Sequence, residues 1–378
     1  MRLLLAGTAL LCAAGLLSAA EPFVIRTVRV FDGVRMLPPT SVLVAGGRIQ
    51  SVGRGVRIPA GARIIDGRGK TLLPGLIDAH VHVRSAEDLK TALRFGVTTC
   101  LDMFTLYQMA AELRAEQAAG KAGGRAELFS AGTPATAPGG HGTEYGVAIP
   151  TLSRPEDAAA FVEARLAEGS DYLKIMKDDG STFGFRRPTL DAETIGALIR
   201  AAHARGRLAI VHIATAGDAR EALAAGADGV AHVHSGGPDA DVARMAAQHG
   251  AFWTPTLAVI THDAPPSARD AALETVRGLH AAGVRILAGT DAPNPGTAYG
   301  ESLHEEMKLL VAAGLSPLEA LTAATSASAS AFRLSDRGRI AVGLRADLVL
   351  VEGDPTRDIR ATRRIAGIWL LGKVILIP

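Results

Sequence analysis

The feature that most constrains the fold of this chain is a regular alternation of short apolar runs with alanine-rich stretches, between about Leu72 and Leu334. The apolar runs predict buried strands and the stretches between them predict amphipathic helices, a pattern typical of consecutive βαβ units. The sequence favours a strand near each of His80, Cys100, Phe129, Lys174, His212, His232, Trp253 and Asp291. Helices are expected between them, for example over 155–168, 191–205 and 301–313. Together these units predict an α/β chain with a (β/α)8 TIM barrel.

The two ends of the chain follow another pattern. From about Phe23 to Thr71 apolar and polar residues alternate between glycine turns, which predicts β-hairpins. The same pattern returns after Leu334. We therefore predict one small β-sandwich domain built from both terminal segments, residues 21–71 and residues 335–378, with the barrel over 72–334 between them.

The first twenty residues are typical of a secretory signal peptide. Arg2 gives a positive start, residues 3–17 are almost wholly apolar, and Ser18-Ala19-Ala20 provides small residues before Glu21. A membrane anchor is the alternative, but the stretch is short for a spanning helix. The sequence thus predicts an exported protein, periplasmic or secreted. Of two cysteines, Cys12 leaves with the signal, and Cys100 is expected to be an apolar core residue.

The charge composition bears on which classes of binding partner are expected. The chain has 40 basic and 38 acidic residues and a formal net charge of +2. This near balance predicts neither a nucleic-acid partner nor a membrane-surface partner once the signal is removed. A small-molecule substrate is expected, and a homo-oligomer is left open.

Polar residues stand where the predicted strands end. His80 and His82 are separated by one residue, so on a strand their side chains point the same way and could hold one metal ion. Lys174, His212, His232 and Asp291 follow or end later strands. In a (β/α)8 barrel the carboxyl ends of the strands share one face. These six residues are therefore expected to meet, although ordinary polar strand ends and an ion pair for Lys174 are the plainer alternatives.

These motifs resemble the metal-dependent amidohydrolase superfamily. They are Gly75-Leu76-Ile77-Asp78-Ala79-His80-Val81-His82, the fourth-strand Lys174, His212 and His232 ending two later strands, Gly289-Thr290-Asp291-Ala292, and the tail 343–350. Within the superfamily, Asp171-Tyr172-Leu173-Lys174-Ile175 and Ala202-His203 look most like the prolidase or imidazolonepropionase-like group. One departure is Ala231, which stands where many such members have glutamate.

The resemblance implies two divalent metal ions, most simply Zn²⁺. His80, His82 and Asp291 would hold the first and His212 and His232 the second. Because an ammonium has no lone pair, Lys174 would bridge them as a CO₂-derived carbamate. Asp291 would transfer a proton between a metal-bridging hydroxide and the leaving amine, giving hydrolysis of an amide or peptide bond in a dipeptide or N-acyl amino acid.

Four residues are predicted to face the substrate. They are His141, Tyr145, His234 and Trp253, with Arg186 or Arg187 available for a substrate carboxylate. By contrast, His203, His249 and His280 are expected to be structural. The alternatives to an amidase are a lactone, ester or organophosphate hydrolase on the same site, a mononuclear deaminase, and a non-catalytic binding protein. No acid of the kind those deaminases use closely follows His212, and Lys174 favours two metals.

Overall fold

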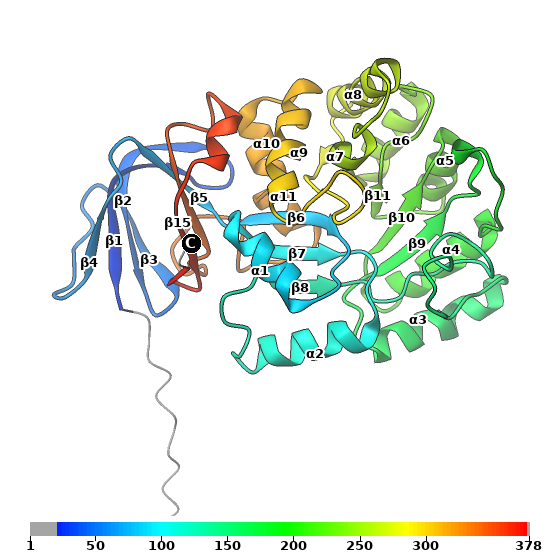
Figure 1. Cartoon of the computed structure of the whole chain (residues 1–378), viewed down its shortest axis with the longest axis horizontal. Coiled ribbons are helices and arrows are strands. Elements are labelled where there is room, and N and C mark those ends of the chain that lie inside the picture. The colour runs from blue at the N-terminus through cyan, green and yellow to red at the C-terminus, as the bar shows by residue number, and fades with distance from the viewer. Residues whose placement is uncertain (1–20, 376–378) are drawn as a thin grey trace, which may run out of the picture.

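The structure is a computed structural model that describes residues 21–375. The predicted signal peptide, residues 1–20, lies outside the described residues. Figure 1 shows a β-sheet that contains both terminal segments beside a larger α/β region. None of the helices in the described part combines the length and apolar character needed to cross a membrane.

The terminal segments share a single eight-stranded sheet, where the sequence predicted a sandwich. Its order is β16-β15-β14-β5-β1-β2-β3, and β4 also pairs with β1. The strands are β1 (Phe23–Phe31), β2 (Met36–Ala45), β3 (Arg48–Gly53), β4 (Arg63–Asp66), β5 (Lys70–Pro74), β14 (Leu348–Glu352), β15 (Ile365–Leu370) and β16 (Lys373–Ile375).

A distortion in β1 explains how a single sheet folds around a core. The first half of β1 pairs with β4 and the second half pairs with β5. Between these halves lies Thr27, which has a left-handed φ of 54°, and the pairing with β2 shifts register there. Such bulges bend a strand, and the sheet encloses its own apolar cluster, in which Phe23 stacks on Trp369 with ring centroids 5.4 Å apart.

The α/β region contains the predicted parallel strands in two sheets. One has the order β6-β7-β8 and the other β13-β12-β11-β10-β9. Isolated parallel bridges, Val81 to Ala292 and Ala135 to Ile175, join the two sheets at both margins. The strands are β6 (Leu76–Val81), β7 (Val97–Asp102), β8 (Glu127–Ser130), β9 (Leu173–Lys177), β10 (Ala209–Ile213), β11 (Gly229–Ala231), β12 (Phe252–Thr254) and β13 (Arg285–Ile286).

Helices separate these strands, as the sequence pattern predicts. Several of the described helices begin at a side chain that accepts a hydrogen bond from the first turn, among them α4 at Asp191 and α5 at Thr215, which forms a capping box with Asp218. The helices are α1 (Ala86–Arg94), α2 (Tyr107–Ala118), α3 (Ala158–Ala167), α4 (Ala192–His203), α5 (Ala216–Ala224), α6 (Ala240–His249), α7 (Leu257–Ile260), α8 (Pro266–Ala281), α9 (Glu301–Ala312), α10 (Pro317–Ala323) and α11 (Ser326–Ala331). Short 3₁₀ turns cover Pro155–Asp157, Ser181–Phe183 and Ile359–Arg363.

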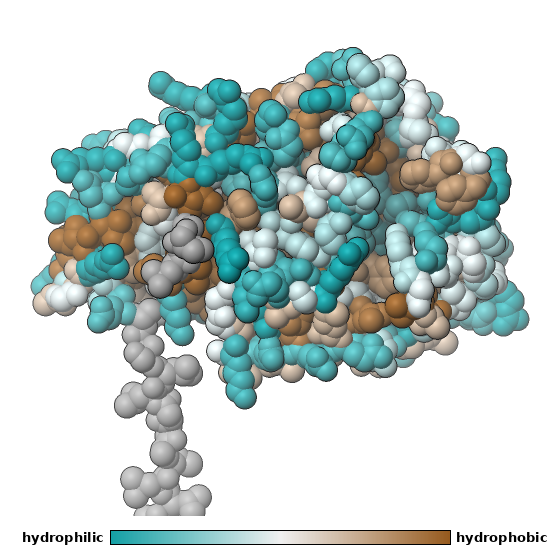
Figure 2. All heavy atoms as spheres, in the orientation of Figure 1, coloured by the Kyte–Doolittle hydropathy of each residue, from teal (hydrophilic) through white to brown (hydrophobic). Residues whose placement is uncertain are grey.

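The apolar core has separate layers on the two faces of the parallel strands. One cluster joins alternate strand residues to the helices, and a second lies on the opposite face of the strands, around Ile77, Leu101 and Ile210. Figure 2 shows polar side chains over much of the visible surface, with apolar side chains exposed over the terminal sheet. This arrangement leaves the carboxyl ends of the parallel strands free to carry polar side chains.

Candidate metal centre

A cavity of about 490 Å³ opens at the carboxyl ends of the parallel strands. All six residues predicted from the strand ends line it: His80, His82, Lys174, His212, His232 and Asp291. They come from β6, β9 and β10, and from the segments that follow β6, β11 and β13. The structure therefore brings together side chains that are more than 200 positions apart in the sequence, as between His82 and Asp291.

His80, His82 and Asp291 form the tightest group. Asp291 Oδ1 lies 2.8 Å from His82 Nε2 and 3.2 Å from His80 Nε2. His82 Nδ1 donates to the Phe104 carbonyl at 3.2 Å, because a carbonyl only accepts. In a neutral His82 ring the Nε2 lone pair then faces a carboxylate oxygen. That arrangement is repulsive unless a proton or a metal ion lies between the two atoms, and these three residues could hold one metal.

The charge states of His80, His82 and Asp291 depend on one another. Burial and the positive charge of Lys174 lower the pKa of His80 to about 3. For Asp291, burial alone would raise the pKa, but the nearby His80 and His82 hold it well below its usual range. For His82, burial opposes protonation, but Asp291 raises the pKa overall. A neutral His80 beside an ionised Asp291 is the ligand state that a divalent cation requires.

Lys174 is a buried residue in the lining of the cavity. It is 1 % exposed, and its Nζ has no hydrogen-bond partner among residues 21–375. Burial lowers the pKa of Lys174 to about 7, against the opposing charges of Asp291 and Asp102. A buried lysine without a partner is rare, so the structure disfavours the ion-pair interpretation and gives an amine that is largely neutral above pH 7.

His232 is oriented by two neighbours that the sequence did not reveal. Its Nδ1 lies 2.8 Å from Thr256 Oγ1, and its carbonyl accepts from Trp253 Nε1 at 2.7 Å. Glu306 of α9 in turn accepts from the backbone N–H groups of Leu257 and Ala258 at 3.1 and 2.7 Å. These contacts fix the segment that carries Thr256 and leave His232 Nε2 for a ligand.

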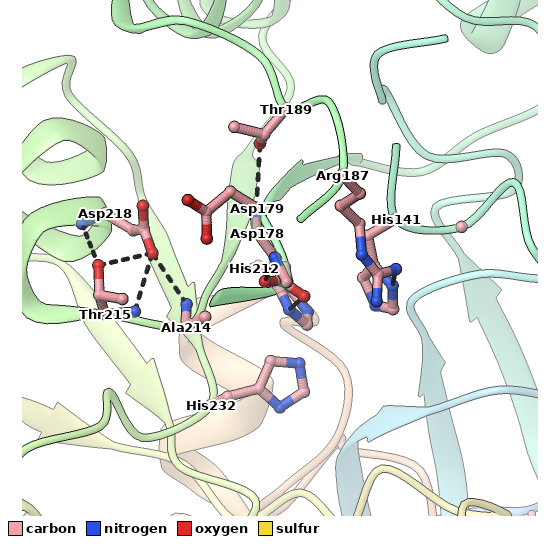
Figure 3. A network of polar contacts seen from close by, with 12 residues as sticks. His141, Asp178, Asp179, Arg187, Thr189, His212, Ala214, Thr215, Asp218 and His232 are labelled. Atoms are coloured by element: carbon pink, nitrogen blue, oxygen red, sulfur yellow. Dashed lines mark hydrogen bonds and ion pairs between the residues drawn. The ribbon is translucent and has the colours of Figure 1, made fainter. Parts of the chain in front are cut away.

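A second candidate ligand group contains His141, Asp178 and His212. The ring of His212 lies 4.4 Å from that of His232 and 4.8 Å from that of His141, between centroids. Figure 3 shows Asp178 beside His212, with His141 and Arg187 on the other side. The sequence analysis missed Asp178. Its spacing of four residues from Lys174, along the same strand and its exit, could have indicated it.

Comparisons with known proteins agree with this geometry. The sequence matches the Amidohydrolase family over residues 71–375. The chain belongs to the amidohydrolase family. It is 31% identical to an imidazolonepropionase of Cereibacter sphaeroides, covering 89% of this chain and 94% of that protein.

Solved structures are also similar to this amidohydrolase, among them the following two. One, from Bifidobacterium longum, is provisionally identified as a prolidase. It has a TM-score of 0.82 and 26% identity, and covers 94% of this chain and 95% of its own. The other is a Xaa-Pro dipeptidase with bound methionine, with a TM-score of 0.81, 24% identity, and coverage of 94% and 99%. The second likeness supports the fold alone. This amidohydrolase is therefore a hydrolase that acts on C–N bonds.

The outer wall of the cavity in this amidohydrolase is largely apolar. His141 and Tyr145 line the cavity, as predicted for substrate-facing residues. Burial raises the pKa of Tyr145 to about 12, so the phenol stays neutral. The apolar residues of the lining are Val83, Phe104, Leu106, Met109, Val147 and Met176. The lining also contains one arginine, Arg84.

The other residues that the sequence predicted to face the substrate lie outside the lining of this cavity. Trp253 is fully buried and packs under the helices, because alternation along β12 turns it away from the cavity. His234 lies 2 % exposed beside a groove between α6 and α8. Neither lines the cavity. Arg186 is paired with Asp179, and Arg187 Nη1 is held 2.6 Å from Glu144 Oε1, so neither is the cavity arginine.

The residues expected to be structural lie outside the cavity lining. Cys100 is a buried free cysteine on β7. His203 Nε2 lies 2.7 Å from Asp228 Oδ2, and His280 Nε2 lies 3.3 Å from Glu319 Oε1. His249 ends α6.

Proposed function

We propose that this amidohydrolase is a binuclear metal-dependent hydrolase that cleaves the amide bond of an N-acyl amino acid or dipeptide. The observation that carries the proposal is the convergence of His80 Nε2 and His82 Nε2 on one oxygen of Asp291, next to a buried Lys174 whose Nζ has no hydrogen-bond partner in the described chain. We also infer that the two parallel sheets, bridged at both margins, form one (β/α)8 barrel around this centre.

The residues present fit a pair of divalent metals. His80 Nδ1, His80 Nε2 and Lys174 Nζ are buried without hydrogen-bond partners among the described residues, and buried polar atoms of this kind are rare without an ion or water. Imidazole and carboxylate ligands suit Zn²⁺. His80, His82 and Asp291 would hold one ion and His212 and His232 the other, with Lys174 carboxylated by CO₂ to serve both.

The metals would supply an activated water and polarise the scissile carbonyl. The chain supplies the proton transfer: Asp291 directs Oδ1 at both histidines, so Oδ2 is available to accept a proton and pass it to the leaving nitrogen. Tyr145, neutral because its pKa is raised, can donate a hydrogen bond to the substrate.

The cavity lining supports a substrate with an apolar acyl group and a free carboxylate. Phe104, Leu106, Met109 and Val147 form an apolar wall, which fits an alkyl or aromatic acyl group. Arg84 lines the same cavity and is exposed, so its guanidinium can pair with a carboxylate. The apolar wall that we propose for the acyl group thus comes from the segments after β7 and β8, and not from Trp253 of β12, which the sequence predicted to face the substrate.

Other reactions remain as outcomes of the test. A lactone, ester or organophosphate would use the same polarised centre. A mononuclear deaminase would leave Lys174 without a role. We also propose export, because residues 1–20 have the pattern of a signal peptide.

The test combines metal analysis with substrate screening of the zinc-loaded protein. We expect about two equivalents of metal per chain and turnover of N-acyl amino acids. Lys174→Ala should lower the metal content and remove most activity, because alanine cannot serve two ions. A Lys174→Ala protein with wild-type metal content and turnover would refute the binuclear centre. Lactone hydrolysis without amide cleavage would refute the amidase assignment and leave the centre intact.

A further inference from the structure

We propose that His141, Asp178 and His212 form an additional binding site for a borderline divalent cation such as Zn²⁺ at the mouth of the cavity. It is separate from the two metal positions proposed above. Because His141 and His212 line the cavity, a cation held there obstructs substrate entry, and the enzyme is inhibited by excess metal. The inference does not depend on which substrate the centre hydrolyses.

The three side chains already converge. One possible ligand atom from each lies within 4.8 Å of the other two, and Figure 3 shows Asp178 beside His212, with His141 across from them. The side chains of Asp178 and His212 are 0% and 14% exposed, and that of His141 is 17% exposed. The site is thus built into the wall and is open to the cavity only on the histidine side.

Asp178 carries the argument for a cation. Its Oδ1 accepts from the Gly180 N–H at 2.7 Å. Its Oδ2 is buried and has no hydrogen-bond partner in the described chain; the nearest basic atom is His212 Nε2, at 3.9 Å, which is too long for a hydrogen bond. A buried carboxylate oxygen left unpaired is costly. A bound cation at this position removes that cost.

The contacts of His141 Nδ1 include a carboxylate, which is the partner that leaves Nε2 for a metal. Glu144 Oε1 lies 2.7 Å from His141 Nδ1. Because a carboxylate only accepts, this contact is a hydrogen bond in the tautomer that has its proton on Nδ1 and its lone pair on Nε2. Arg187 Nη1 lies 2.8 Å from the same Nδ1 and can only donate, but its shorter contact is with Glu144 Oε1, at 2.6 Å. With Arg187 donating to Glu144, Nδ1 can donate to the same carboxylate.

Closure around the ion requires a small movement. Zinc ligands lie about 2.0 to 2.1 Å from the metal, so the three donor atoms must draw closer together than they are in this structure. Gly139 and Gly142, with φ of 72° and 101°, flank His141 and allow its loop to move. His212 has two ring nitrogens, so Nε2 can serve this site while Nδ1 remains for the proposed centre. When both are ligated, the Nε2 proton is released to solvent.

A cobalt titration of the full mature chain tests the proposal. Co²⁺ is added to the wild type, Asp178→Asn, His141→Gln and the matched control Asp179→Asn, and binding is followed by visible absorption and equilibrium dialysis. We expect a weaker equivalent after the tight ones in the wild type and the control. Asp178→Asn and His141→Gln should weaken that equivalent at least about tenfold and keep the tight ones.

The contrary results are distinct. If no weaker equivalent binds to the wild type, or if Asp178→Asn binds it unchanged, the proposal is wrong. If Asp178→Asn instead loses a tight equivalent, Asp178 positions His212 for the proposed centre, and the additional site is again refuted. A wild type that binds the weaker equivalent but no tight ones would count against the proposed function alone, and Lys174→Ala should leave the weaker equivalent in place.

Discussion

Thr256 Oγ1 lies 2.8 Å from His232 Nδ1, and both residues have left-handed backbones, with φ of 51° and 76°. A β-branched residue seldom adopts this conformation. Strain of this kind persists when surrounding contacts over-determine it, and it is concentrated at functional sites. Here Glu306 binds the next two backbone N–H groups. The hydroxyl thus presents the other nitrogen of His232 to the centre.

Replacing this hydroxyl tests its role. Thr256→Val keeps the β-branched shape and removes the hydrogen bond, so metal affinity should fall about 10- to 100-fold with little change in secondary structure. Thr256→Ser, which keeps the hydroxyl, is the control and should bind metal as the wild type does. Metal dissociation constants measured with a competing chelator check this. Equal constants for all three proteins would show that Thr256 does not orient His232.

The lowered pKa of Lys174 predicts a pH-dependent assembly of the centre. Below pH 7 the amine is protonated and cannot react with CO₂; above its pKa of about 7 it is mostly neutral. Bicarbonate-stimulated metal uptake by the metal-free protein should therefore increase as the pH rises from about 6 to 8. Time courses of uptake with and without bicarbonate provide the measurement. A flat profile, or one that falls with pH, would contradict carboxylation of a neutral Lys174.

Asp291→Asn separates metal binding from proton transfer. Asparagine tolerates the left-handed φ of 62° at this position and keeps an oxygen near His80 and His82, but it is not a base. The value of kcat should fall at least about 10²-fold, while metal content falls less. Steady-state kinetics and metal analysis on the same preparation check both. Near-normal turnover would move the base to another cavity residue, of which His141 is the first candidate.

Arg84 should recognise the substrate carboxylate. Arg84→Met keeps most of the apolar stem and removes the charge, so KM for a free-acid N-acyl amino acid should rise about 10- to 100-fold, as expected for loss of a charged hydrogen bond. The matching amidated substrate should be affected little. Arg186→Met, whose guanidinium is paired with Asp179, is the control. An equal effect of Arg84→Met on acid and amide would remove the carboxylate role.

The sequence was informative wherever a local period decides the geometry. Alternation along β6 places His80 and His82 on one side, and the exits of parallel strands share one face. The six residues predicted on these grounds line one cavity. The same rule, applied to β12, would have excluded Trp253, since the adjacent residues Phe252 and Trp253 face opposite layers of the core.

Other features depend on contacts that no local pattern encodes. Glu306 acts on Leu257 across 49 positions of sequence, and its effect on His232 passes through a backbone conformation that threonine rarely takes. The sequence pointed to Arg186 and Arg187 and not to Arg84, because the ion pairs of those two with Asp179 and Glu144 are known only from the folded structure. The single sheet formed by the termini depends on the bend at Thr27, a residue that does not itself indicate a bulge.

The pairing of β5 with β14 can form only late in the synthesis of the chain. Lys70 and Glu352 face each other across this pair, 282 positions apart, so β5 has no partner on that edge until nearly the whole chain has emerged. Long-range strand pairing is slow, and an unpaired edge strand invites association with other chains. A protein truncated before Leu348 would therefore expose an unpaired edge of β5, directly before β6, the strand that carries His80. Cells that produce such fragments should accumulate them as aggregates.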